Sequence, residues 1–122
     1  MKHRNLLFVG LVIGLLFMAA CAETLEPLLN GQTVTLVAPS NNVTSSDTVQ
    51  TFYWQPVTSA VQYQLQIVTP RFDSIVTMVA DTVITTTDFS VALGQGTYQW
   101  RVQAMNNSTS SQYSAAWNLT VQ

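Results

Sequence analysis

The stretch that decides the fold is Val61-Gln62-Tyr63-Gln64-Leu65-Gln66-Ile67, in which apolar and polar residues alternate strictly. Successive side chains of a β-strand point to opposite faces of the sheet, so a period of two indicates a strand that is half buried. The apolar members Tyr63, Leu65 and Ile67 are predicted to face a core, and the glutamines between them to face solvent. A helix would scatter the same residues around its circumference.

Six further segments are rich in β-branched and aromatic residues, which fit the pleated surface of a sheet. These segments are Thr33–Val37, Val49–Gln55, Ser74–Val79, Val83–Phe89, Thr97–Met105 and Ala116–Val121. Turn formers such as Pro56, Pro70 and Asp81 stand between the segments. Seven strands with turn residues about every ten positions predict an all-β chain, a seven-stranded antiparallel β-sandwich.

The stretch Leu93-Gly94-Gln95-Gly96-Thr97-Tyr98-Gln99-Trp100-Arg101-Val102-Gln103-Ala104-Met105-Asn106 resembles the E–F corner and F strand of fibronectin type III domains. The matching positions are Leu93, Gly96, Tyr98, Val102, Ala104 and Asn106. The resemblance implies a buried Tyr98 ring whose hydroxyl bonds the backbone upstream and locks the crossover between the sheets. It covers residues 36–122 and implies a fibronectin type III-like sandwich, with another immunoglobulin-like topology as the alternative.

Three other positions agree with the same family. Trp54 stands where the family has its core tryptophan on strand B, and Ala60 and Tyr63 fit the start of strand C. The segment Trp117–Val121 fits strand G. The resemblance therefore implies that Trp54 and Tyr63 are buried.

Residues 1–20 have the organisation of a secretory signal peptide. Lys2, His3 and Arg4 give a positive start, and a nearly unbroken apolar run follows from Leu6 to Ala20. This run is shorter than the roughly 20 residues that a helix needs to span a bilayer. The segment is predicted to direct export.

The residues Leu16-Phe17-Met18-Ala19-Ala20-Cys21 resemble a bacterial lipobox, although Met18 replaces the more usual leucine. The resemblance implies cleavage before Cys21, lipidation of its sulfur by a diacylglycerol and, usually, acylation of its new amine. More than one acyl chain gives stable anchoring, so a lipid-anchored protein of the bacterial cell envelope is expected. Ala22, where an aspartate retains many such proteins at the inner membrane, favours the outer membrane. The alternatives are ordinary signal cleavage and an uncleaved anchor.

Three parts of the chain follow from these patterns. Residues 1–20 are the predicted signal peptide, residues 21–32 the lipidated cysteine with a tether, and residues 33–122 the sandwich. The tether is inferred from Glu23, Pro27, Asn30 and Gly31, which interrupt any regular period.

Charge and residue inventory exclude most catalytic and metal chemistry. After residue 20 the chain has two arginines, six acids, no lysine, no histidine and only Cys21, a net formal charge of −4. No Ser-His-Asp set can be drawn, and the Cys and His clusters of zinc sites are missing. The negative charge disfavours nucleic acid. The sequence predicts a protein that is not an enzyme, with no metal and no cofactor.

The strand pairing implied by the fibronectin resemblance creates one candidate binding surface. If the strand at 61–67 pairs with the strand at 97–105, their outward residues share a face. These residues are Gln62, Gln64, Gln66, Gln99, Arg101 and Gln103. Amides both donate and accept hydrogen bonds, so this face is predicted to dock a partner protein or a glycan. The alternative is a solvated face without a ligand.

Exposed aromatic residues and acidic tripeptides are the remaining candidates. Tyr53, Phe72 and Tyr113 are expected near the surface, where rings stack on sugars or simply pack. Asp47-Thr48-Val49, Asp73-Ser74-Ile75 and Asp81-Thr82-Val83 resemble an acceptor motif for bacterial O-glycosylation, which implies Thr48, Ser74 and Thr82 as acceptors. The alternative is that Asp-Ser and Asp-Thr simply form turns before strands.

These features are compatible with two main function classes. The first is a non-catalytic binding or assembly module in an envelope complex, with a protein partner. The second is a small carbohydrate-binding accessory of a glycan-uptake system, because residues 36–41, 51–54 and 63–67 after a lipoprotein start are similar to the N-terminal module of outer-membrane glycan-binding lipoproteins. A purely structural spacer is the third possibility.

Overall fold

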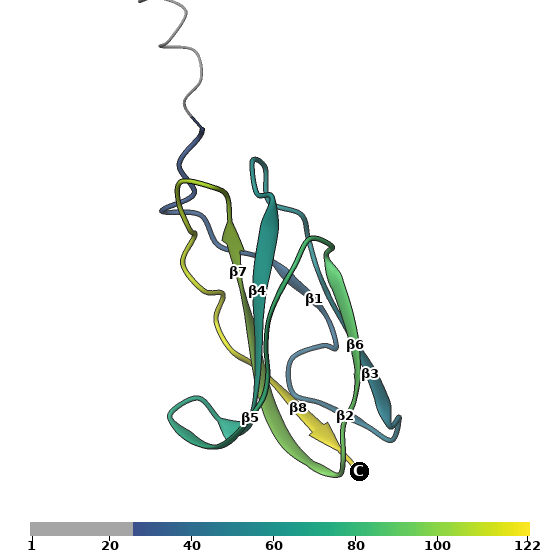
Figure 1. The fold of residues 1–122 in the computed structure, drawn as a ribbon. Helices are drawn as coiled ribbons and strands as arrows, with labels where there is room; N and C mark the ends of the chain where they lie inside the picture. Colours follow the sequence, from purple (N-terminus) through teal and green to yellow (C-terminus); the bar gives the residue numbers. More distant parts are fainter. Residues whose placement is uncertain (1–25) are drawn as a thin grey trace, which may run out of the picture.

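The computed structural model describes residues 26–122, which form two β-sheets packed face to face, with no helix among them (Figure 1). The strands are β1 (Leu36–Ala38), β2 (Val43–Ser45), β3 (Val49–Trp54), β4 (Gln62–Arg71), β5 (Ser74–Ile84), β6 (Asp88–Ala92), β7 (Gly96–Met105) and β8 (Trp117–Val121). One sheet has the order β1-β3-β6 and the other β2-β8-β7-β4-β5. Within these residues no helix is long and apolar enough to cross a membrane.

The predicted all-β sandwich is confirmed, but the strand count is eight rather than seven. The additional strand is β2, which runs parallel to β8 with Thr44 opposite Thr120, whereas the other paired strands are antiparallel. Three residues between turn formers are too few to show a period of two, so the sequence carries no signal for β2.

The prediction of one strand over Val83–Phe89 is wrong. Strand β5 ends at Ile84 and β6 begins at Asp88, because the chain leaves the five-stranded sheet and enters the three-stranded sheet between them. The intervening residues 85–87 are all threonine. Their β-branched side chains match a strand composition, which explains the error.

Two predicted turn residues lie inside strands instead. Asp81 is within β5, opposite Gln66. Pro70 is near the end of β4, where the β4–β5 register shifts between Thr69 and Pro70. Proline has no N–H to donate, so a place beside such an irregularity costs the sheet little.

The core lies between the two sheets. Phe52 of the small sheet is fully buried against Trp100 of the large sheet, with ring centroids 4.9 Å apart and an edge-to-face angle of 70°. Trp117 meets Trp100 from another side at 6.0 Å. The predicted inward alternation of Tyr63, Leu65 and Ile67 is confirmed.

The crossover between the sheets has the predicted geometry. Tyr98 is buried, and its hydroxyl donates a 2.7 Å hydrogen bond to the carbonyl of Gly94. Trp54 is also buried, with its ring 5.8 Å from that of Tyr63. The Tyr63 hydroxyl in turn accepts a hydrogen bond from the amide of Val57 at 3.0 Å.

The tether prediction needs a correction for its second half, because the described residues from 26 onward are held against the sandwich. Leu29 is fully buried in the core, and its amide donates to Thr109 Oγ1 at 2.9 Å. Asn106 Nδ2 donates to the carbonyl of Pro27 at 2.8 Å. The Glu26 carboxylate accepts from the amide of Asn107 at 3.1 Å. We call residues 26–29 the N-terminal strap. Cys21 and the signal peptide lie outside the described residues.

Candidate binding face

The six residues predicted to share an outer face do share one. Gln64 lies opposite Gln103, and Gln66 lies opposite Arg101, in the antiparallel pair β4–β7. All six side chains are partly exposed, and the inward positions between them are buried. We call this surface the glutamine face; it consists of Gln62, Gln64, Gln66, Gln99, Arg101 and Gln103.

Strand β5 extends the glutamine face in a way that the sequence pattern did not indicate. Val83 lies opposite Gln64, Asp81 opposite Gln66, and Met78 opposite Val68. Residues that pair directly across an antiparallel ladder project from the same side of the sheet. The face therefore gains one carboxylate and exposed apolar groups. The sequence analysis missed this extension because it treated Asp81 as a turn residue between two strands, whereas Asp81 lies within β5.

Most amides of the face are already bonded within the protein. Gln64 Nε2 donates to Asp81 Oδ1 at 2.8 Å. Gln66 bridges the two charges of the face, because its Oε1 accepts from Arg101 Nε at 2.9 Å and its Nε2 lies 3.5 Å from Asp81 Oδ1. Gln103 Nε2 donates to the carbonyl of Ser111 at 2.8 Å. The result is a pre-ordered row, Asp81–Gln66–Arg101, across three strands.

Two aromatic rings lie against Arg101. The guanidinium carbon is 4.1 Å from the centroid of the Phe72 ring and 4.4 Å from that of Tyr113. Tyr113 is placed there because Ser111 and Ser114 on either side bond their amides to β7 carbonyls, at 2.8 and 2.9 Å. A guanidinium over the face of a ring is attracted by the ring quadrupole. The predicted surface aromatics Phe72 and Tyr113 thus converge on one cation.

The same surroundings change the acidity of Tyr113. Burial raises the pKa of its phenol above the ordinary value, the charge of Arg101 lowers it, and the charge of Asp81 raises it further, with burial the largest of the three influences. The net direction is upward, so the ring carries a neutral hydroxyl beside Arg101 at neutral pH.

The β4–β5 hairpin folds back over the part of the glutamine face that contains Gln99 and Arg101. The amide of Phe72, at the hairpin turn, donates to Gln99 Oε1 at 2.9 Å. Val68 is fully buried although its register places it on this outer side and outside the main core cluster. Gln99 and Arg101 therefore hold the hairpin down, which is a positioning role that the sequence did not indicate.

We expect Arg101→Ala to loosen the hairpin. Losing the cation between two rings removes about 0.5–2 kcal/mol of attraction, so hydrogen exchange of the Phe72 amide should become roughly two- to thirtyfold faster. Exchange is measured by NMR in the intact protein. Arg71→Ala is the matched control, because the Arg71 side chain is 64% exposed and its ion pair is with Asp73 at 3.6 Å. Equal exchange in the two variants would contradict the assignment.

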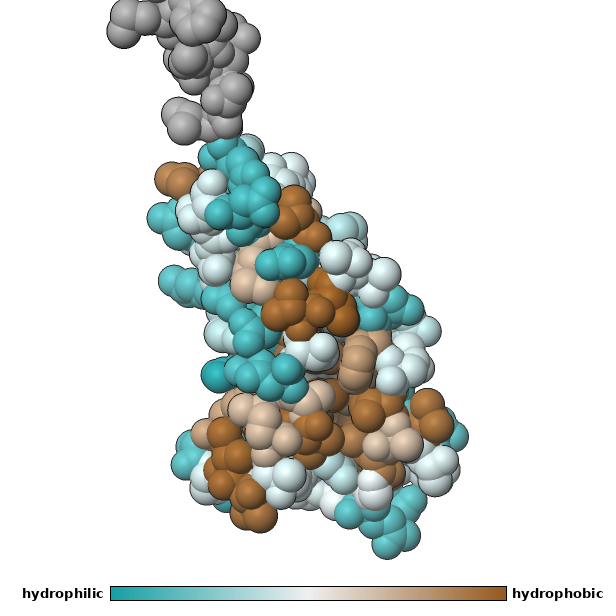
Figure 2. Space-filling view, in the orientation of Figure 1, coloured by the Kyte–Doolittle hydropathy of each residue, from teal (hydrophilic) through white to brown (hydrophobic). Residues whose placement is uncertain are grey.

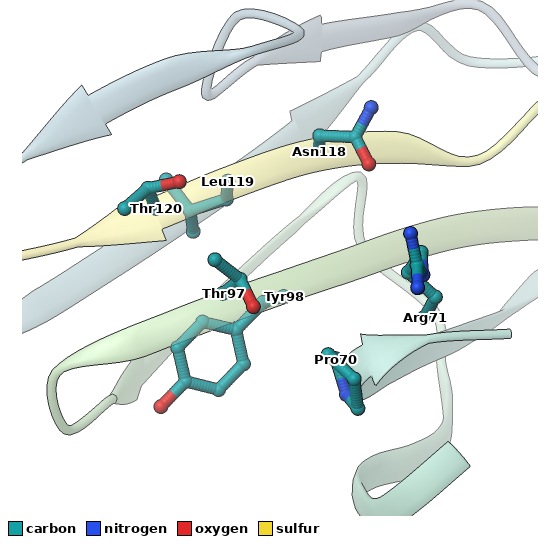
Figure 3. Close-up of a pocket in the computed structure, with 7 residues that line it drawn as sticks. All are labelled: Pro70, Arg71, Thr97, Tyr98, Asn118, Leu119 and Thr120. Atoms are coloured by element: carbon teal, nitrogen blue, oxygen red, sulfur yellow. The ribbon is translucent and has the colours of Figure 1, made fainter. Parts of the chain in front are cut away.

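A pocket of about 350 Å³ lies between the hairpin and the ends of β7 and β8. Figure 3 shows Pro70 and Arg71 on the hairpin side and Thr97 and Asn118 on the opposite strands. The remaining lining residues are Tyr98, Leu119 and Thr120. The pocket exists because β4 stops pairing with β7 after the Val68–Gln99 step.

Hydrophobic side chains also reach the surface near the hairpin. Figure 2 shows them gathered over the lower half of the molecule, where Figure 1 places the β4–β5 hairpin. Val76 is 80% exposed, and Ile75 and Met78 are 46% and 42% exposed. Within residues 26–122 no group of three or more His, Cys, Asp or Glu is placed to hold a metal ion.

Comparisons with known proteins concern the fold. No family model and no curated protein matches the chain. The fibronectin type III domain of the human collagen alpha-1(XX) chain is 12% identical, with a TM-score of 0.53, over 70% of this chain and 82% of that domain. A fibronectin type III domain of the human KIAA0970 protein is 16% identical, with a TM-score of 0.50, over 72% and 69%. A Fn3-like protein from Clostridium thermocellum is 22% identical, with a TM-score of 0.46, over 80% and 94%.

The chain has a fibronectin type III fold. This confirms the fold that the Leu93–Asn106 stretch implied, together with the buried Tyr98 at the corner before β7. In this fibronectin type III fold the glutamine face is the solvent side of the five-stranded sheet, away from the core.

The three proposed O-glycosylation positions have different surroundings in the fibronectin type III fold. Thr48 is exposed before β3, and Ser74 is exposed at the hairpin turn. Thr82 is half-buried and lies opposite the fully buried Leu65, so its hydroxyl is on the core side of β5. Thr48 and Ser74 are therefore the exposed residues among the three predicted positions.

Proposed function

We propose that this protein is a lipoprotein of a bacterial cell envelope, anchored through Cys21, whose fibronectin type III-like domain is a non-catalytic binding or assembly module. The lipobox-like residues before Cys21 support the anchor, and Ala22 favours the outer membrane. The fold supports the module, since structurally similar domains include that of the collagen alpha-1(XX) chain.

The composition of the glutamine face carries the docking proposal. Together with the adjoining part of β5, its accessible side chains are amides, one arginine beside two aromatic rings, the carboxylate of Asp81, and the apolar Val83 and Met78. Protein interfaces are enriched in aromatic residues, Met and Arg and depleted in Lys, Glu and Asp. This face has no Lys and no Glu, and its one acid, Asp81, already accepts hydrogen bonds from Gln64 and Gln66. The internally bonded row Asp81–Gln66–Arg101 needs little further ordering on binding, which lowers the entropic cost.

The position of the face suits a partner in the same envelope layer. The N-terminal strap lies at one end of the elongated sandwich, and the β4–β5 hairpin lies at the other end (Figure 1). The large sheet runs along the length between them. In a domain held at the strap end, the glutamine face would therefore point along the membrane surface, toward neighbouring proteins of the same layer.

The anchor is tested by labelling growing cells with a palmitate analogue. The native chain should incorporate the label and fractionate with membranes, whereas Cys21→Ser should lose both properties. An unlabelled native chain would overturn the anchor.

Docking is tested with a photo-crosslinking amino acid at position 64, on the glutamine face, or at position 51, on the three-stranded sheet. We expect discrete adducts from position 64 only. Val83→Lys should abolish them, because a lysine would have to be desolvated at the interface. Val49→Lys is the matched control, since Val49 and Val83 are 58% and 51% exposed on different sheets. Adducts that survive Val83→Lys, or that form equally at both positions, would contradict docking by this face.

The pocket beside the hairpin favours a second candidate function, a carbohydrate-binding accessory. Its lining combines hydroxyl, amide and guanidinium groups with apolar surface, which is the mixture that small-ligand pockets use for orientation and contact. Retention of the native protein on immobilised polysaccharide, and its loss on filling the pocket with Thr120→Trp, would support this function.

A further inference from the structure

Two hydroxyl groups in the pocket have no partner within the described residues. Thr97 and Thr120 lie directly opposite each other on β7 and β8, and both line the pocket (Figure 3). Neither side-chain hydroxyl makes a hydrogen bond inside residues 26–122. By contrast, the Asn118 amide is held by Gln99 at 2.8 Å and by Asn42 at 3.0 Å. The pocket thus combines an Asn118 amide that is held in place with two threonine hydroxyls that have no partner among residues 26–122.

The pocket carries a positive charge without a lining carboxylate. Arg71 lines it, and none of the acids among residues 26–122 does. Asp73 contacts Arg71 through Nε at 3.6 Å, and the Arg71 side chain is 64% exposed, so its guanidinium is open to a ligand. The edge formed by terminal guanidinium nitrogens matches a carboxylate.

The remaining lining is apolar and well fixed. Pro70 supplies compact apolar surface, whereas the Tyr98 ring and the Leu119 side chain are buried in the core behind the pocket, and the Tyr98 hydroxyl is bonded to Gly94. A volume of about 350 Å³ is at the small end of the range for ligand pockets, which suits one or two sugar rings rather than an extended polymer.

We propose that this pocket binds a carboxylate-bearing sugar unit. Arg71 pairs with the carboxylate, Thr97 and Thr120 exchange hydrogen bonds with ring hydroxyls, and the C–H face of the sugar packs on Pro70. The proposal rests on the carbohydrate-binding function above and names its ligand class. Gln99 and Arg101 act as positioning residues, because they hold the hairpin that carries Arg71.

The test uses the full-length native protein in detergent and isothermal titration with two matched probes. One probe is digalacturonic acid, and the other is its fully methyl-esterified form, which has the same rings without the charge. We expect the acid to bind about tenfold more tightly than the ester, as one charge-assisted contact would give.

Three variants sharpen the comparison. Arg71→Gln should weaken the binding of the acid about tenfold and so remove its preference over the ester. Asp73→Asn should tighten binding of the acid two- to threefold, because it frees the guanidinium from its competing carboxylate. Thr51→Val, on the outer side of the other sheet, is the control and should change nothing.

The outcomes separate this inference from the function on which it rests. Equal binding of acid and ester would overturn the carboxylate assignment while leaving carbohydrate binding in place. No binding of either probe would overturn both. Binding of the peptide carboxylate N-acetyl-alanyl-alanine as tightly as the acid sugar would also overturn the sugar assignment.

Discussion

Trp100→Ala is expected to lower the free energy of unfolding by about 3–5 kcal/mol, the range for removing a large aromatic side chain from a packed core. Trp100 is fully buried and joins the two sheets through its edge-to-face contacts with Phe52 and Trp117. Guanidinium denaturation followed by circular dichroism measures the change. For a domain of this size the loss is a large fraction of the total free energy of unfolding.

Trp100→Phe is the informative companion. The indole nitrogen of Trp100 is buried with no hydrogen-bond partner among the described residues, so replacing the indole by a phenyl ring breaks no polar contact. Its cost is therefore that of a smaller cavity and should be well below that of the alanine variant. If the two variants were equally destabilised, packing around Trp100 would not be the source of its contribution.

Leu29→Ala is expected to cost about 2–5 kcal/mol, although Leu29 precedes the first strand by seven positions. Its side chain is fully buried in the core cluster beneath the N-terminal strap. Thermal or chemical denaturation of the intact protein measures the loss.

The neighbouring residue provides the control. Leu28 is 63% exposed, so Leu28→Ala removes the same atoms from the same segment and should change stability by no more than about 0.5 kcal/mol. Equal and small effects at both positions would show that residues 26–32 behave as a free tether after all.

The sequence predicted those structural features that depend on residues close together along the chain. The alternation through Tyr63, Leu65 and Ile67 is a local consequence of strand geometry, and it placed both faces of β4 correctly. The Tyr98 corner was also predicted, through the resemblance of Leu93–Asn106 to fibronectin type III domains, and its hydroxyl bonds Gly94 as that resemblance implied.

Features that depend on distant parts of the chain could not be predicted from the sequence. The break at residues 85–87 follows from the passage between sheets, and the burial of Leu29 depends on a loop eighty residues later. The aromatic environment of Arg101 needs a hairpin that folds back and a segment from the other side of β7. Contacts between segments so distant in sequence leave no periodic pattern in any one segment.

The N-terminal strap has a mechanical consequence. A pull transmitted to Glu26 would load the contacts of Glu26, Pro27 and Leu29 with residues 106–109 one after another rather than together. Contacts loaded in sequence peel apart at low force, whereas the long ladders of β4 with β5 and β7 would stay unstressed. The strap would thus detach before the two sheets are loaded.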